Sequence, residues 1–178
     1  MKLRKTLCCF LAIIFVFGTF CNSANAAGVV PVPSGLYIID NDALASSGYW
    51  NGGTGFSKYI EDSSLYNQDA RVASASEGGS YEYNHNKIYV GTKFYANVGV
   101  YLNHITFEDP AAEYYCWVNG RAISFATINQ NTAPAGWNYR TFPTQTREYN
   151  SYMDGVQVVS SKRKATGADA ISIQYWAY

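Results

Sequence analysis

The sequence predicts an antiparallel, all-β domain of the jelly-roll or β-sandwich type, and three observations support this. After residue 26 the chain contains all 16 Tyr and all 4 Trp but only four Leu; Tyr and Trp favour strands, whereas Leu favours helices. Apolar and polar residues alternate in short runs, and no long window places apolar residues at helical spacing. Gly, Asn, Ser and Pro separate these runs at the spacing expected of roughly eight to ten strands.

The first 26 residues have the three parts of a secretory signal peptide. Lys2, Arg4 and Lys5 form a charged start, residues 7–17 are apolar, and Ala24-Asn25-Ala26 is a small-x-small cleavage pattern. The apolar run is too short to span a bilayer, which takes ~20 residues. We therefore expect a secreted, extracellular protein without a stable membrane anchor. Residues 27–35 are expected to form a short extended lead-in, and residues 36–178 one domain.

The charge and the cysteine content of the chain after residue 26 argue against a nucleic-acid partner and against a disulfide framework. Ten Lys and Arg stand against thirteen Asp and Glu, and this mildly acidic balance argues against nucleic acid as a partner. Cys116 is the only cysteine after residue 26, which excludes an intramolecular disulfide framework. Since Cys116 shares a strand face with Tyr114 and Val118, we expect a buried, inert thiol.

The expected strands follow from alternation and from the turn residues between them. In chain order they are residues 36–40, 69–75, 80–83, 93–103, 111–119, 121–129, 138–142, 156–160 and 169–177. Residues 41–68 and 130–137 are rich in turn-forming residues and are expected to be loops. Asn119-Gly120 predicts a tight hairpin between the two strands on either side of it.

Two of these strands have a clear inner and outer face. In residues 93–103 the even-numbered positions are apolar and are expected to face the core, so Tyr95 and Tyr101 face away from it. In residues 111–119 the same reasoning places Tyr115 and Trp117 on the non-core face.

Five segments, taken in order, resemble the golvesin-like family, also described as the carbohydrate-binding-like domain of some polysaccharide lyases. The segments are Tyr37–Asp42 followed by Gly48–Trp50; Tyr59 with Tyr66 and Ala70; Ala112–Tyr114; Ile128–Gln130 followed by Gly136–Tyr139 and Thr141-Phe142; and Gly167–Ile171. The resemblance extends over about residues 36–178. It implies a galactose-binding-like β-sandwich and a glycan-binding role, and it supplies no catalytic residues.

Aromatic side chains are the strongest functional lead in the sequence. A sugar ring has an apolar face on which an aromatic ring stacks, and a polar rim to which amides and acids hydrogen-bond. We expect a glycan or cell-wall polymer as the partner, with Tyr101 and Trp117 as the main stacking residues. The alternative is that the loop tryptophans plug the ends of the sandwich. The candidate ligand-binding residues are Tyr95, Tyr101, Tyr115, Trp117, Trp50 and Trp137.

Three aspartates are candidate ligands for calcium, the one cofactor that the sequence suggests. Asp40 and Asp42 lie at the end of the first strand and Asp169 opens the last; these strands often lie near each other in a sandwich. Calcium prefers several oxygen ligands. The alternative is that Asp40 and Asp42 form Asx-turns and Asp169 accepts backbone hydrogen bonds.

The sequence contains no recognisable catalytic motif. There is no G-x-S-x-G nucleophile elbow and no H-E-x-x-H zinc motif. His85 and His104 are the only histidines, and both are expected at the surface. We therefore expect a carbohydrate-binding protein that is not an enzyme. The alternatives are a structural or protein-interaction component of the extracellular matrix or envelope and, less favoured, a glycan-degrading hydrolase or lyase.

Overall fold

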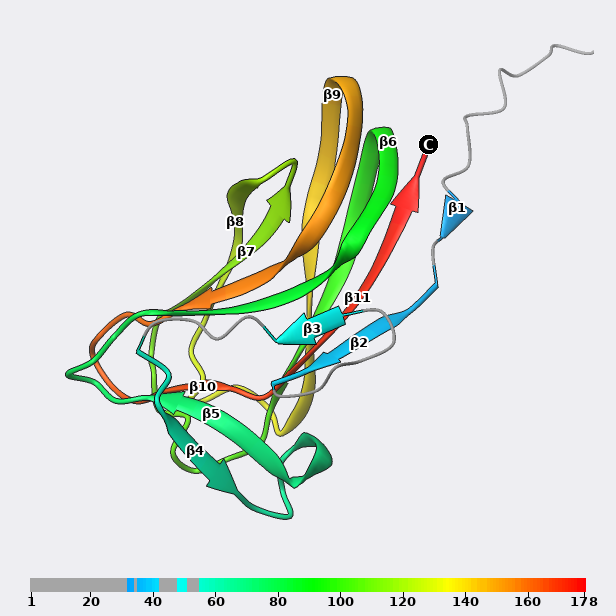
Figure 1. Ribbon diagram of the computed structural model, residues 1–178. Coiled ribbons are helices and arrows are strands. Elements are labelled where there is room, and N and C mark those ends of the chain that lie inside the picture. The colour runs from blue at the N-terminus through cyan, green and yellow to red at the C-terminus, as the bar shows by residue number, and fades with distance from the viewer. Residues whose placement is uncertain (1–31, 34, 42–47, 51–54) are drawn as a thin grey trace, which may run out of the picture. The chain divides into compact units, whose positions relative to one another are not determined.

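Two long strands organise the fold. The structure is a computed structural model that describes residues 32–33, 35–41, 48–50 and 55–178. The strands β6 (Ser80–Leu102) and β9 (Gly136–Val159) pair antiparallel from one end to the other. Both fold over together where their register shifts, near Gly91 in β6 and at residues 147–150 in β9 (Figure 1). One continuous sheet is thereby folded into two layers.

The first layer contains residues 80–91 of β6 and residues 151–159 of β9. Strand β3 (Gly48–Trp50) pairs with β6, β7 (Ala112–Val118) pairs with β9, and β8 (Arg121–Ile128) pairs with β7. Asn119 and Gly120 join β7 to β8 with φ values of 52° and 71°. Positive φ at both positions is what a two-residue hairpin of type I′ needs, so the predicted hairpin is confirmed.

The second layer contains residues 93–102 of β6 and residues 136–146 of β9. Strand β11 (Ala170–Ala177) pairs with β6, and β1 (Val32–Pro33) and β2 (Tyr37–Asp40) pair with the other edge of β11. A separate small sheet contains β4 (Lys58–Glu61), β5 (Asp69–Ala73) and β10 (Thr166–Ala168). Within the described ranges the only helical element is the 3₁₀ turn η1 (Tyr66–Gln68), and no helix could span a membrane.

The core lies between the inner faces of the two layers. Phe142 from the second layer packs against Phe94 at 6.3 Å and against Phe125 of β8 at 6.2 Å between ring centroids. The even-numbered residues from Phe94 to Leu102 and from Ala112 to Val118 are all buried, as their alternation predicts. The predicted all-β, antiparallel sandwich is confirmed.

Some expectations for single segments are wrong. Residues 84–92 and 143–155 continue β6 and β9, because bulges at the fold-over interrupt the side-chain alternation from which strands are recognised. Residues 58–61, within an expected loop, form β4. His85, expected at the surface, is buried because it lies on the inward side of β6, and this burial lowers the pKa of its imidazole. The buried thiol of Cys116 is confirmed, and its burial raises the thiol pKa.

Several predicted features lie outside the described residues. They are the signal peptide, the aspartate Asp42 and most of the lead-in. Of the lead-in, Val32–Pro33 forms β1 and pairs with the end of β11. The backbone of Trp50 pairs with that of Tyr83, but the Trp50 side chain is not among the described parts of the chain.

Candidate functional site: an aromatic face on the second layer

The register of three strands builds an aromatic face on the outside of the second layer. Residues opposite each other in paired strands project to the same side of a sheet. Tyr101 lies opposite Trp137 in the β6–β9 pairing, and Tyr95 lies opposite Trp176 in the β11–β6 pairing. We use the name aromatic face for the outward residues of these strands, which are Tyr95, Asn97, Gly99, Tyr101, Trp137, Tyr139, Thr141, Ser172, Gln174 and Trp176, together with the adjoining Tyr66.

One end of the aromatic face is a cluster of three rings. Tyr66 extends from η1 and meets Tyr101 at 5.6 Å and Trp137 at 5.5 Å, and Tyr101 meets Trp137 at 5.3 Å. All three pairs are edge-to-face, an arrangement that aromatic quadrupoles favour. Because each ring contacts the other two, the orientation of the cluster is fixed before any ligand arrives.

Gly99 lets three side chains close over the middle of β6. A Cβ atom at Gly99 would lie 2.3 Å from Ser172 Oγ, 2.9 Å from Tyr139 Cε1 and 3.1 Å from Trp137 Cε3. These distances are too short for a real side chain, so the closure depends on glycine. Tyr139 remains 53% exposed beside this point, and its ring is therefore accessible to a ligand.

A second aromatic cluster lies at the other end of the face. Tyr95 and Trp176 stack with centroids 4.9 Å apart and an interplanar angle of 4°. The exposed ring of Tyr178 lies 6.3 Å from Tyr95, and the Lys93 ammonium lies 4.3 Å above that Tyr178 ring. The lysine gives this end of the face a positive charge, in a cation–π contact.

Polar side chains separate the two clusters. Asn97 lies opposite Gln174 on one side and Thr141 on the other. The Asn97 amide is half-buried on the outward side of β6. An amide in that state can donate to one hydroxyl and accept from another. The residues that define the face include no carboxylate, histidine or cysteine.

The structure places the predicted aromatic residues on two different surfaces. Tyr95, Tyr101 and Trp137 lie on the aromatic face, and Trp137 is the second residue of β9 instead of lying in a loop. Tyr115 and Trp117 lie on the outer side of β7 in the first layer. Tyr101 and Trp117, expected as partners in stacking, therefore lie on opposite outer faces of the sandwich and cannot share one bound sugar.

Several residues of this face were not among the predicted ligand-binding residues. Alternate residues of a strand share a face, so alternation could have predicted two of them. Tyr139 is two residues after Trp137, and Trp176 alternates with Ser172 and Gln174. The alternation rule does not point to Tyr66, which reaches the face from the turn η1 outside these strands.

The predicted calcium ligands Asp40 and Asp169 lie near each other at one end of β2 and β11. Asp40 is opposite Ala170 in the register, and both carboxyl groups are buried. Burial, with the nearby charges of Asp40 and Asp69, raises the pKa of Asp169 to about 8. The Tyr66 backbone N–H donates to Asp169 Oδ2 at 3.1 Å, while Oδ1 has no hydrogen-bond partner.

These carboxyl groups offer the oxygen ligands that calcium prefers. In the part of the chain that the structure describes, however, no three His, Cys, Asp or Glu side chains are grouped so as to hold a metal ion. The third predicted ligand, Asp42, is outside that part. Calcium binding therefore stays a prediction.

Comparison with known proteins finds similarity only at the level of structure. No family model and no curated protein match the chain, so the resemblance to the golvesin-like family is not confirmed. The chain is similar to the CBM35 from Cellvibrio japonicus Abf62, with 9% identity over 78% of this chain and 92% of that chain and a TM-score of 0.45. It is also similar to CBM29_1, a family 29 carbohydrate binding module from Piromyces equi, with 15% identity over 83% and 91% and a TM-score of 0.46.

An exo-β-1,3-galactanase from Phanerochaete chrysosporium, solved with galactose, is similar over a part of its length. The identity is 11%, the TM-score is 0.45, and the match covers 79% of this chain but 29% of the galactanase. With identities this low and TM-scores below 0.5, these similarities identify no ligand for this chain.

Proposed function

We propose that this protein binds an extended glycan across the aromatic face, outside the cell and without catalysing a reaction on it. The observation that carries the proposal is the arrangement of two aromatic clusters on either side of Asn97 and Gln174. Each cluster offers apolar ring surface to one face of a sugar, and the amides between them match ring hydroxyls. The resemblance of the sequence to the golvesin-like family implies the same class of ligand.

The composition of the face favours a glycan over a protein partner in a matrix or envelope. A surface built for protein assembly is commonly a contiguous apolar patch or an unpaired strand edge. Here the rings are interrupted by Asn97, Thr141 and Gln174, and Tyr95 and Tyr101 lie on β6, which is paired on both sides by β9 and β11. A sugar polymer can stack on the aromatic rings and hydrogen-bond to the polar side chains between them at the same time.

The test is a glycan array with the mature protein, followed by titration of the best ligand with the Tyr139→Ala variant. Tyr139 is 53% exposed, so its loss removes a stacking ring with little effect on folding. We expect the affinity to fall about five- to thirtyfold, or ~1–2 kcal/mol, with the melting temperature nearly unchanged.

Trp117→Ala is the matched control, because Trp117 lies on the outer side of the first layer. It should leave the affinity unchanged. If Trp117→Ala weakens binding and Tyr139→Ala does not, the glycan site lies on β7 and the proposal is wrong. If the wild-type protein retains no glycan, a structural role in the matrix or envelope is favoured instead.

A further inference from the structure

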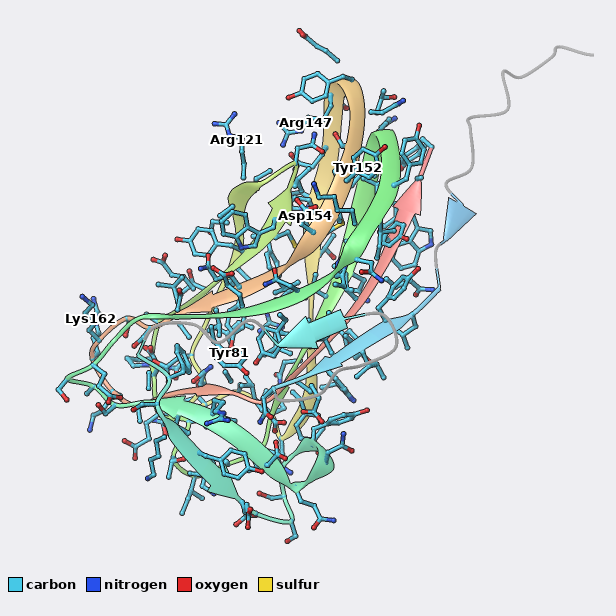
Figure 2. All side chains as sticks on the ribbon, viewed as in Figure 1. Tyr81, Arg121, Arg147, Tyr152, Asp154 and Lys162 are labelled. Carbon is cyan, nitrogen blue, oxygen red and sulfur yellow. The ribbon has the colours of Figure 1, made fainter. Side chains whose placement is uncertain are left out.

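A positively charged cavity lies where the β7–β8 hairpin meets the bend of β9. Its volume is about 230 Å³, and its polar lining comes from Asn119, Arg121, Arg147 and Tyr149. Val118 and Ile123 add apolar surface. The cavity shares no residue with the aromatic face. Figure 2 shows Arg121 and Arg147 together at the end of the strands where β6 and β9 fold over, with Lys162 near the other end.

Arg147 carries a buried donor that lacks an acceptor. Its Nη2 atom donates to Gln145 Oε1 at 3.1 Å, which orients the guanidinium group. Its Nε–H is buried and has no hydrogen-bond partner. Leaving such a donor unpaired is unfavourable, more so on a charged group. The position of Arg147 therefore suits a ligand that supplies an acceptor oxygen.

No acidic side chain of the cavity wall neutralises the two arginines. The ion pairs among the described residues join His104 to Asp62 and Lys164 to Glu108, so neither Arg121 nor Arg147 takes part in one. The carboxylates closest along the chain are Glu148, which is exposed, and Asp154, which accepts the Gly120 N–H at 2.9 Å. Neither lines the cavity. The cavity is thus a local positive site in a chain with an excess of acidic residues after residue 26.

The wall that carries Arg121 is held in place by hydrogen bonds. The Asn119 N–H donates to the Tyr152 carbonyl at 3.0 Å, and Asn119 Oδ1 accepts the Tyr152 N–H at 2.8 Å. With the bond from Gly120 to Asp154, these contacts fasten the hairpin turn to β9. Because Arg147 is on the same strand, the backbones that carry Arg121 and Arg147 are held at fixed positions, and the bond to Gln145 orients the Arg147 guanidinium group, which limits the entropy that it loses on binding.

We infer that this cavity binds the oxyanion of an acidic glycan, either the carboxylate of a uronic acid or a sulfate ester. Guanidinium groups bind both through paired, charge-assisted hydrogen bonds, and Arg121 and Arg147 both line the cavity. The ring of Tyr149 can cover the sugar that carries the charge. That the oxyanion belongs to a glycan rests on the proposed function, whereas its binding to the two arginines does not.

The experiment compares matched charged and neutral sugars. The probes are a tetragalacturonate against its methyl ester, and a sulfated galactan tetrasaccharide against its desulfated form, each titrated by calorimetry. We expect at least one charged probe to bind about tenfold more tightly than its neutral match, and added salt to reduce this gain. The pair that shows the gain identifies the oxyanion as carboxylate or sulfate. In NMR spectra of the arginine side chains, the Arg147 Nε–H signal should shift as that probe is added.

Two variants and a control locate the effect. Arg121→Gln and Arg147→Lys should each remove most of the charged-probe gain, the second by losing the fork of donors while keeping the charge. Arg163→Gln removes one cation from the exposed turn at residues 162–164 and should have no effect. The inference would be overturned if charged and neutral probes bound equally, or if the Arg147 Nε–H signal did not move. It would also be overturned if Arg163→Gln lost as much of the charged-probe gain as Arg121→Gln and Arg147→Lys.

The outcome for the cavity can be separated from that for the aromatic face. Tyr139→Ala should weaken the neutral and the charged probe by the same factor if the aromatic face binds the sugar chain. If Tyr139→Ala changes neither while the arginine variants still lose the charged-probe gain, the proposed function fails and the cavity stands as an oxyanion site.

Discussion

Gly99 is the residue on which the geometry of the aromatic face depends most directly. Glycine in the interior of a strand weakens it, because glycine loses more backbone entropy on folding and has no side chain to pack. In β6 this glycine lets Ser172, Tyr139 and Trp137 close over the strand from both sides. A position that costs stability in the sheet thus serves the shape of the binding surface.

Gly99→Ala should lower the affinity for the glycan about tenfold, or ~1.4 kcal/mol. The added Cβ would lie within 3.1 Å of atoms of all three side chains, so Tyr139 and Trp137 must move from their places on the face. The melting temperature should fall as well, because the nearest of these atoms, Ser172 Oγ at 2.3 Å, belongs to a buried side chain. Gly35→Ala is the control, since a Cβ there meets no atom within 4 Å. Unchanged affinity in Gly99→Ala would show that the ligand does not use this part of the face.

At the scale of the elements, alternation along a strand predicts which residues face the core but not which strands are neighbours. The inner and outer faces of 93–103 and 111–119 were predicted correctly from this rule, because each strand has one face against the core. Pairing depends on contacts between distant parts of the chain. The sequence therefore could not show that Tyr101 has Trp137 beside it and that Trp117 lies in the other layer.

One buried carboxylate ties together the connections that flank two of these elements. Asp109, just before β7, accepts hydrogen bonds from the backbone N–H groups of Ala111 at 2.9 Å and Ser161 at 2.8 Å, and from the Thr166 hydroxyl at 2.6 Å. The Ser161 hydroxyl also donates to it. These contacts join the start of β7 to the segment between β9 and β10. Burial raises the pKa of Asp109, but the hydrogen bonds lower it by more, and the net pKa lies below the usual value.

Asp109→Asn should destabilise the protein by ~1–3 kcal/mol at pH 7, because the amide replaces one acceptor by a donor in a site that supplies only donors. A depressed carboxyl pKa contributes stability above the unfolded pKa, and that contribution is lost as the pH falls through the folded pKa. The wild-type protein should therefore lose stability below about pH 4 more steeply than the variant. Urea unfolding at pH 7 and pH 3 measures both effects. Equal stability of the two proteins at pH 7 would contradict this role of Asp109.

At the scale of the whole molecule, the first and last strands close the second layer and bring carboxyl groups together. Pairing of β2 with β11 places Asp40 near Asp169, and Asp69 at the start of β5 adds a third charge. The sequence predicted the first two as neighbours, because the two ends of a sandwich chain often pair. It could not show the long strands that fold over, since their central parts lack regular alternation. The same carboxyl groups make the stability of the domain depend on pH.

In the presence of a chelator, the free energy of unfolding should fall as the pH rises from about 4 to 8. The folded pKa of Asp169 is about 8, whereas an Asp in an unfolded chain has a pKa of about 3.9. The folded state therefore binds its proton more tightly, and this contribution is complete below the unfolded pKa and lost as the pH rises through the folded pKa. Melting temperatures measured from pH 4 to 9 test the slope. Asp169→Asn, which stays neutral, should flatten most of it, and a difference between wild type and variant that stays constant from pH 4 to 9 would contradict the raised pKa of Asp169.

Calcium offers a second way to neutralise the same charges, and it leaves a different signature. If the ion binds Asp40, Asp42 and Asp169 as the sequence predicts, a hundredfold excess over Kd should raise the stability by ~2.7 kcal/mol. The gain should be larger at pH 8 than at pH 5, because protons compete with the metal for Asp169 at the lower pH. Asp169→Asn should lose most of the calcium gain and keep its flat pH profile. Identical wild-type melting temperatures in calcium and in chelator at pH 8 would show that the calcium prediction is wrong, and that below pH 8 the buried carboxyl group is neutralised by its proton.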